Sequence, residues 1–155
     1  MKRIVIMGVG NLLFSDEGIG VHAVRALEKK GYPKNVEIHD GGTFGLLSAP
    51  MFENADTLIL IDAVDANGEA GEVRRYTKDE IMLSTIPVKL SPHQIGIQET
   101  LLVTDLRGNC PEEVIFYGVI PASYESSIEL TETGQKALKE VIDLVDKEVH
   151  SRLNV

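Results

Sequence analysis

Three acidic side chains and one histidine stand where this sequence is expected to do chemistry. Glu17 follows a short apolar run that ends at a glycine-rich turn, Asp40 follows a second such run, and Asp62 ends a third. His93 stands at the start of a segment with helical spacing, directly after a Ser-Pro pair. Carboxylate oxygens and an imidazole nitrogen suit a divalent cation such as nickel, zinc, iron or manganese. Three protein ligands would leave a coordination position open for substrate or water.

These side chains meet only if strands alternate with helices along the chain. Arg3–Met7, Val36–His39 and Thr57–Ile61 are short, mostly apolar runs, and the last is the pattern of a strand buried on both faces of a sheet. Alternating strands and helices favour a mostly parallel sheet, and open α/β sheets bind ligands at the carboxyl ends of their strands. The four candidate side chains are therefore expected at one edge of the sheet.

The remaining segments complete the predicted fold. Glu72–Thr77 has the polar alternation of an edge strand, which we expect to run antiparallel, and Val114–Ile120 is the last buried strand. A first helix is expected after Ser15 as N-cap, and a second from Thr43 to about Asn54, divided by Pro50. Further helices are expected at Lys78–Met82 and from Pro92, with Ser91 as N-cap. The closing segment is also helical, with an apolar stripe formed by Ala137, Leu138, Val141, Leu144, Val145 and Val149. The predicted fold class is α/β, a three-layer α/β/α sandwich around a mostly parallel, five-stranded twisted sheet with an antiparallel edge strand. Residues 1–155 are expected to form one domain.

Each candidate also has a purely structural interpretation. Asp16 and Glu17 can complement the dipole of the helix that follows them, which is worth ~0.3–1 kcal/mol each. Asp40 can accept hydrogen bonds from the two glycine amides after it, an alternative that the Asp-Gly-Gly sequence favours. Asp62 can cap the loop after its strand, and His93 can be exposed in a first helical turn. The meeting of these residues at one edge is what favours a site.

Composition excludes several classes of function. The formal net charge of -9 and the lack of a Lys/Arg cluster argue against a nucleic-acid partner. Cys110 is the only cysteine, which excludes an intramolecular disulfide and a thiolate metal site and fits a reducing cytoplasm.

No apolar run reaches the length of a signal peptide or a membrane span. The Gly8-x-Gly10 turn lacks the third glycine of the dinucleotide fingerprint, because Leu13 stands there. We expect a cytoplasmic protein with no membrane partner.

At these residues the chain resembles the hydrogenase maturation endopeptidases, which trim the C-terminal extension of the large subunit of nickel–iron hydrogenases. The family's opening G-x-G-N…D-E-x-x-G motif is matched by Gly8, Gly10, Asn11, Asp16, Glu17 and Gly20. Its D-G-G-T motif is matched by Asp40–Thr43, its D-A-x-D motif by Asp62, Ala63 and Asp65, and its helix-opening histidine by His93. Each motif is short, but their order and spacing are specific, and the resemblance covers nearly the whole chain.

The resemblance implies a function and a substrate. Glu17, Asp62 and His93 would contact nickel already inserted in the precursor of a hydrogenase large subunit. Nickel would thus arrive with the substrate and not as a resident cofactor, in keeping with the lack of an HExxH helix. Asp40, with Asp16 in reserve, is the candidate for handling a proton or orienting the substrate. Nickel recognition alone and Lewis-acid catalysis by nickel would select the same three ligands. We expect the protease to be a monomer.

Two alternatives come from other classes of protein. One is a non-catalytic metal or nucleotide sensor on a Rossmann-like sheet, in which an anion binds at the N-terminus of the first helix. Asp16 and Glu17 would repel a phosphate there. The other is an ordinary zinc peptidase with broad substrates, which would cleave unstructured peptides.

Overall fold

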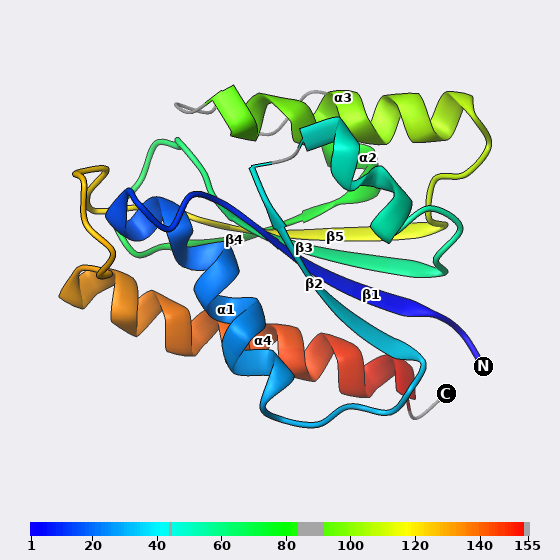
Figure 1. Ribbon diagram of the computed structural model, residues 1–155, viewed down its shortest axis with the longest axis horizontal. Coiled ribbons are helices and arrows are strands. Elements are labelled where there is room, and N and C mark those ends of the chain that lie inside the picture. The colour runs from blue at the N-terminus through cyan, green and yellow to red at the C-terminus, as the bar shows by residue number, and fades with distance from the viewer. Residues whose placement is uncertain (44, 84–91, 154–155) are drawn as a thin grey trace.

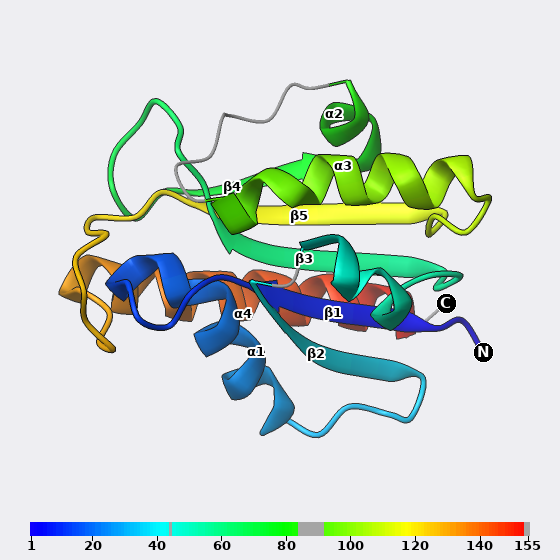
Figure 2. The ribbon, with the colours of Figure 1, turned by 45° about the horizontal axis from the view of Figure 1, so that its top comes forward.

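The protein forms one five-stranded sheet with helices on both faces (Figures 1 and 2). The computed structural model describes the backbone of residues 1–43, 45–83 and 92–153, and the side chains of these residues except 45, 46 and 92–95. The strands are β1 (Ile4–Val9), β2 (Val36–Gly42), β3 (Thr57–Ala63), β4 (Val73–Thr77) and β5 (Glu113–Val119), in the spatial order β2-β1-β3-β5-β4. All neighbours are parallel except β4, which pairs antiparallel with β5. The predicted fold class and edge strand are confirmed.

The two faces of the sheet carry different helices. Helices α1 (Ile19–Glu28) and α4 (Glu132–Leu153) cover one face, while the 3-10 helix η2 (Gly45–Met51), α2 (Lys78–Met82) and α3 (Pro92–Leu106) cover the other (Figure 1). Strands β1 and β3 are buried at every position because both of their faces are covered. Among the described residues, no helix is long and apolar enough to cross a membrane.

Alternate residues of the strands enter two separate hydrophobic cores. On β1, Ile4 and Ile6 pack in the core under α1 and α4, which also holds Val141 and Val145 of the predicted stripe. Val5 and Met7 point the other way, into the core that contains Phe52, Ile81 and Leu101. This alternation follows from the two-residue period of a strand.

The start of the first helix differs from the sequence-based prediction. A 3-10 turn, η1 (Ser15–Gly18), comes first, and α1 begins at Ile19 with Gly18 as its N-cap and no side-chain cap. The predicted cap by Ser15 is therefore wrong. The Ser15 hydroxyl instead donates to the Glu129 carbonyl oxygen at 3.0 Å, because the loop that carries Glu129 lies against this turn.

Two other boundaries differ from the prediction, and a third lies outside the described residues. Strand β2 continues through Asp40–Gly42, beyond the predicted end at His39. The predicted helix from Thr43 to about Asn54 is the shorter 3-10 helix η2, with Pro50 inside it, since proline lacks the amide that a continuing α-helix needs. Ser91, predicted as the N-cap of α3, lies outside the described residues, but α3 does begin at Pro92.

Two glycines allow the start of α1 to lie directly on the sheet. A β-carbon on Gly20 would stand 2.2 Å from the carbonyl oxygen of Ile61 and 2.4 Å from that of Val9. A β-carbon on Gly8 would stand 2.0 Å from the carbonyl oxygen of Gly20. Both positions therefore exclude any side chain, and this contact fixes the loop between β1 and α1 above the carboxyl ends of β1 and β3.

Gly20→Ala tests this contact. We expect the substitution to lower the free energy of unfolding by about 2–3 kcal/mol or more, because the added methyl group meets backbone atoms that can only move together with their strands. Urea unfolding measures the change. Gly31→Asn is the control, since Gly31 has φ 73° with nothing within 4 Å of a β-carbon and asparagine tolerates that conformation. Equal stability of Gly20→Ala and the wild type would contradict the assigned role.

Candidate active site

The carboxyl ends of β1, β3 and β5 lie on the same side of the molecule (Figure 1). Three loops gather there: residues 10–14 with the turn η1, residues 64–72, and residues 120–131. Helices α1 and α3 both begin at this side (Figure 1). The structure thus brings the elements that carry all the predicted site residues to one edge.

Glu17 and Asp62 are both buried at this edge. Glu17 lies in η1 and is 4% exposed, and Asp62 lies near the end of β3 and is fully buried at 0%. The turn η1 packs on β3, so the two carboxylates come from neighbouring elements. One oxygen of Asp62 accepts a hydrogen bond from the Ala63 amide at 2.7 Å. Carboxylates are seldom buried without a structural or functional reason, because burial removes water from a charge.

His93 lies in the first turn of α3, as predicted, and α3 begins at this edge of the sheet (Figure 1). Its side chain is outside the described part of the structure. Among the side chains that are described, no group of three or more His, Cys, Asp or Glu is arranged to hold a metal ion. That Glu17, Asp62 and His93 share one cation therefore stays a prediction.

Asp16 is buried and fully occupied by hydrogen bonds to distant parts of the chain. One oxygen accepts from the Thr131 amide at 2.9 Å, and the other accepts from the Ala122 amide at 2.9 Å and the Thr131 hydroxyl at 2.7 Å. A β-carbon on Gly134 would stand 2.2 Å from an Asp16 oxygen, so glycine is needed for this approach. Asp16 holds the 120–131 loop and the start of α4 against η1, which favours a structural role for it.

Asp40 is exposed on β2, one strand outward from β1. It stands opposite Gly8 in the sheet, and one carboxylate oxygen accepts a hydrogen bond from the Gly42 amide at 2.8 Å. This is the Asx-type contact that the Asp-Gly-Gly sequence predicts. Asp40 therefore has a local structural role, and its exposure at the carboxyl edge also leaves it accessible to a substrate.

Tyr124 is a neighbour of the site that the sequence did not single out. It lies in the 120–131 loop, and burial raises the pKa of its phenol, with smaller contributions from the negative charges of Asp65 and Glu17. The same electrostatic contributions place the phenol of Tyr124 near these two carboxylates. A lone tyrosine in a polar loop carries no periodic signal, which explains why sequence patterns miss it.

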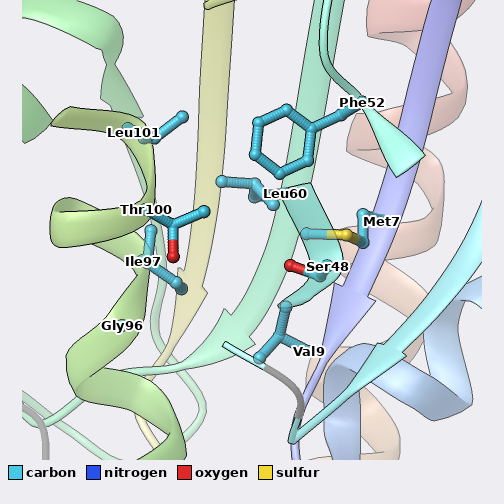
Figure 3. A pocket seen from close by; sticks show the side chains of 9 residues that line it. All are labelled: Met7, Val9, Ser48, Phe52, Leu60, Gly96, Ile97, Thr100 and Leu101. Atoms are coloured by element: carbon cyan, nitrogen blue, oxygen red, sulfur yellow. The ribbon is translucent and has the colours of Figure 1, made fainter. Parts of the chain in front are cut away.

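An apolar cavity opens beside the edge, between the sheet and the α3 face (Figure 3). It is small, with a cavity volume of about 20 Å³, and part of it is open to solvent. Its lining comes from β1, β3, η2, the turn after η2, and α3: Met7, Val9, Leu60, Ser48, Phe52, Gly96, Ile97, Thr100 and Leu101. Val9 ends β1 and Gly96 lies one helical turn after His93, so the cavity adjoins the candidate site.

The fold and the edge define a class: an α/β/α sandwich with buried acids and an accessible carboxylate where its parallel strands end. A family model described as HycI, hydrogenase maturation protease, matches residues 21–148. The hydrogenase 2 maturation protease of Escherichia coli K12 is 38% identical over 144 residues, 92% of this chain and 88% of that protein. The solved structure of the hydrogenase maturating endopeptidase HybD from E. coli superposes with a TM-score of 0.90 at 36% identity, over 97% of this chain and 93% of that one. This chain belongs to the hydrogenase maturation protease family.

The HupD protein of Bradyrhizobium diazoefficiens is 41% identical over 125 residues, which are 80% of this chain and 65% of that protein. The HupD protein of Rhodobacter capsulatus is 37% identical over 125 residues, or 60% of its own length. The match to these hydrogenase expression/formation proteins thus spans a little under two thirds of their length. The family resemblance read from the motifs is confirmed.

Asp16→Asn and Asp40→Asn should differ in their effect on stability, because Asp16 is buried and Asp40 is exposed. We expect Asp16→Asn to lower the free energy of unfolding by about 1–3 kcal/mol, because an amide nitrogen would replace one of the two buried oxygens of Asp16 that accept hydrogen bonds from Ala122 and Thr131. Asp40→Asn should change it by less than about 0.5 kcal/mol, since Asp40 is exposed and Asn keeps the acceptor for Gly42. Chemical denaturation of both variants measures the difference. Wild-type stability of Asp16→Asn would show that its hydrogen bonds are dispensable.

Proposed function

We propose that this protein is an endopeptidase that removes the C-terminal extension of a nickel-loaded precursor of a nickel–iron hydrogenase large subunit. Family membership supports the reaction class. The observation that carries the proposal is the burial of Glu17 and Asp62, both in family motifs, on neighbouring elements at the edge where α3 begins with His93. Its relatives are themselves named as hydrogenase maturation proteases.

In this proposal Glu17, Asp62 and His93 contact nickel that belongs to the substrate. Two carboxylates and one imidazole, without a thiolate, are expected to bind free nickel only modestly. A nickel ion already held by the precursor brings its charge and the scissile segment into the site together, so recognition and positioning happen in one step. The same contact would allow nickel to polarise the scissile carbonyl.

Asp40 is the proposed proton-handling or substrate-orienting group. Its carboxylate is exposed at the rim, within reach of an extended peptide, whereas the oxygens of Asp16 are already occupied by Thr131 and Ala122. Asp16 is therefore the weaker of the two predicted candidates.

The charge of the edge also weighs against the anion-binding alternative. A phosphate at the N-terminus of α1 would stand beside Asp16 and Glu17, whose negative charges oppose it. We propose further that the protein acts as a monomer in the cytoplasm, where a single free cysteine is compatible with reducing conditions.

Asp62→Asn and His93→Ala should abolish processing and leave the fold intact. Asp62→Asn preserves volume, and a ligand contributes to function by its donor atom more than by packing. The readout is the shift of a purified nickel-loaded precursor to its shorter form on a gel, with urea unfolding as the test of folding. Asp105→Asn, at an exposed position of α3, is the matched control and should process normally. Loss of cooperative unfolding in either site variant would assign that residue a structural role.

Cleavage should depend on nickel in the substrate and not on nickel in the protease. The protease is treated with chelator and incubated in parallel with nickel-free and nickel-loaded precursor. We expect only the loaded form to be cut, because a cation is needed to offset like charges that are crowded at the buried edge. Equal processing of both forms, or processing of the nickel-free form alone, would refute the proposal.

A further inference from the structure

Two loops beside the site expose large apolar side chains to solvent. Leu13 is 61% exposed, Phe14 37% and Ile128 71%. These three residues, together with Ser126 and Ser127, line one open hollow on the surface. We refer to Leu13, Phe14 and Ile128 as the apolar edge patch. Contiguous apolar surface on a soluble domain commonly marks an interaction site.

The chain holds this patch in a fixed arrangement by hydrogen bonds between the two loops. The Ser15 amide donates to the Ser127 carbonyl oxygen at 2.8 Å, and the Ser127 amide donates to the Leu13 carbonyl oxygen at 2.9 Å. The hydrogen bonds that Asp16 accepts from the 120–131 loop tie the same two segments together. The patch is therefore a built surface and not the tip of a loose loop, although the apolar side chains gain little burial from it.

The surroundings of the patch are acidic. Positions 4–24 and 108–135 contain no Lys or Arg, and the exposed Glu125 and Glu129 lie on the same loop as Ile128. A partner that covers the patch would thus bind most tightly if its apolar surface were bordered by basic side chains, because charge complementarity favours association and sets the orientation of the two proteins.

We propose that the apolar edge patch docks the folded part of the substrate precursor, through an apolar surface with a basic border. This rests on the proposed function. The occupant follows from position: Phe14 and Glu17 belong to the same short segment, so a folded protein that delivers a metal ion to Glu17 lies over the patch as well. The patch stabilises the bound precursor and the transition state equally, so it affects affinity and not the rate of cleavage. The buried acids act on the metal-bearing centre.

The double variant Leu13→Ser/Ile128→Ser tests the docking surface. We expect KM for the nickel-loaded precursor to rise about tenfold, and directly measured precursor binding to weaken by the same factor, with kcat changed less than about twofold. Both positions are exposed, so the variant should unfold in urea like the wild type. Leu13→Met/Ile128→Val keeps the apolar surface and should restore wild-type KM. Leu106→Ser, at an 87% exposed position where α3 ends far from the site (Figure 2), is the control and should leave KM unchanged.

The outcomes separate this proposal from the proposed function. If the wild type cuts the precursor and the double variant does so with the same KM, the docking surface is refuted and the protease function stands. If the wild type neither binds nor cuts the precursor, both fail. If light scattering shows a wild-type dimer that the double variant converts to monomer without a change in KM, the patch joins two copies of this chain, and the docking proposal is overturned.

Discussion

The close contact of helix α1 with the ends of β1 and β3 is the constraint on which the site depends. Gly8 and Gly20 have no room for a β-carbon because each faces backbone atoms of the other element. Gly10, at φ 147°, lies in the same way against the carbonyl oxygen of Glu17. Glycines of the opening family motif are thus explained by packing, and their effect is to bring the turn η1 down onto the sheet. Burial of Glu17 follows from that approach.

Asp16 and Glu17 show how one turn gives two adjacent acids different tasks. The carboxylate of Asp16 reaches across to the amides of Ala122 and Thr131, and Gly134 leaves space for it. Glu17 lies in the same turn, which packs on β3 next to the strand end that carries Asp62. The hydrogen bonds of Asp16 order the 120–131 loop, and that loop carries both Tyr124 and Ile128. One buried carboxylate therefore organises the rim around another.

Sequence patterns predicted the parts of this structure that local periodicity governs. The continuous apolar runs identified β1 and β3, and the polar alternation of Glu72–Thr77 identified the antiparallel edge. The N-cap assigned to Ser15 failed because its hydroxyl bonds a carbonyl 114 residues away, a partner that no local pattern contains. The contacts of Asp16 span 106 to 115 residues for the same reason. The motif residues of the site could be chosen from sequence, but the task of each depends on partners that only the fold assembles.

Charge is distributed unequally between the two edges of the sheet, and this bears on selectivity. At the amino ends of the strands, acids are paired with arginines: the Arg3 guanidinium and, less strongly, His39 lower the pKa of Glu37 to about 2, and Arg152 lowers the pKa of Glu113. The loops at the carboxyl edge, residues 10–18, 64–72 and 120–131, contain no Lys or Arg of their own, and Arg74 of β4 pairs with Glu72 of the second loop. Seven acidic residues stand in these three loops, so the edge where the proposed substrate binds is negatively charged. An anionic ligand meets an acidic rim that opposes its approach, whereas a cation-bearing ligand is favoured by the same field, so discrimination arises from repulsion as well as attraction.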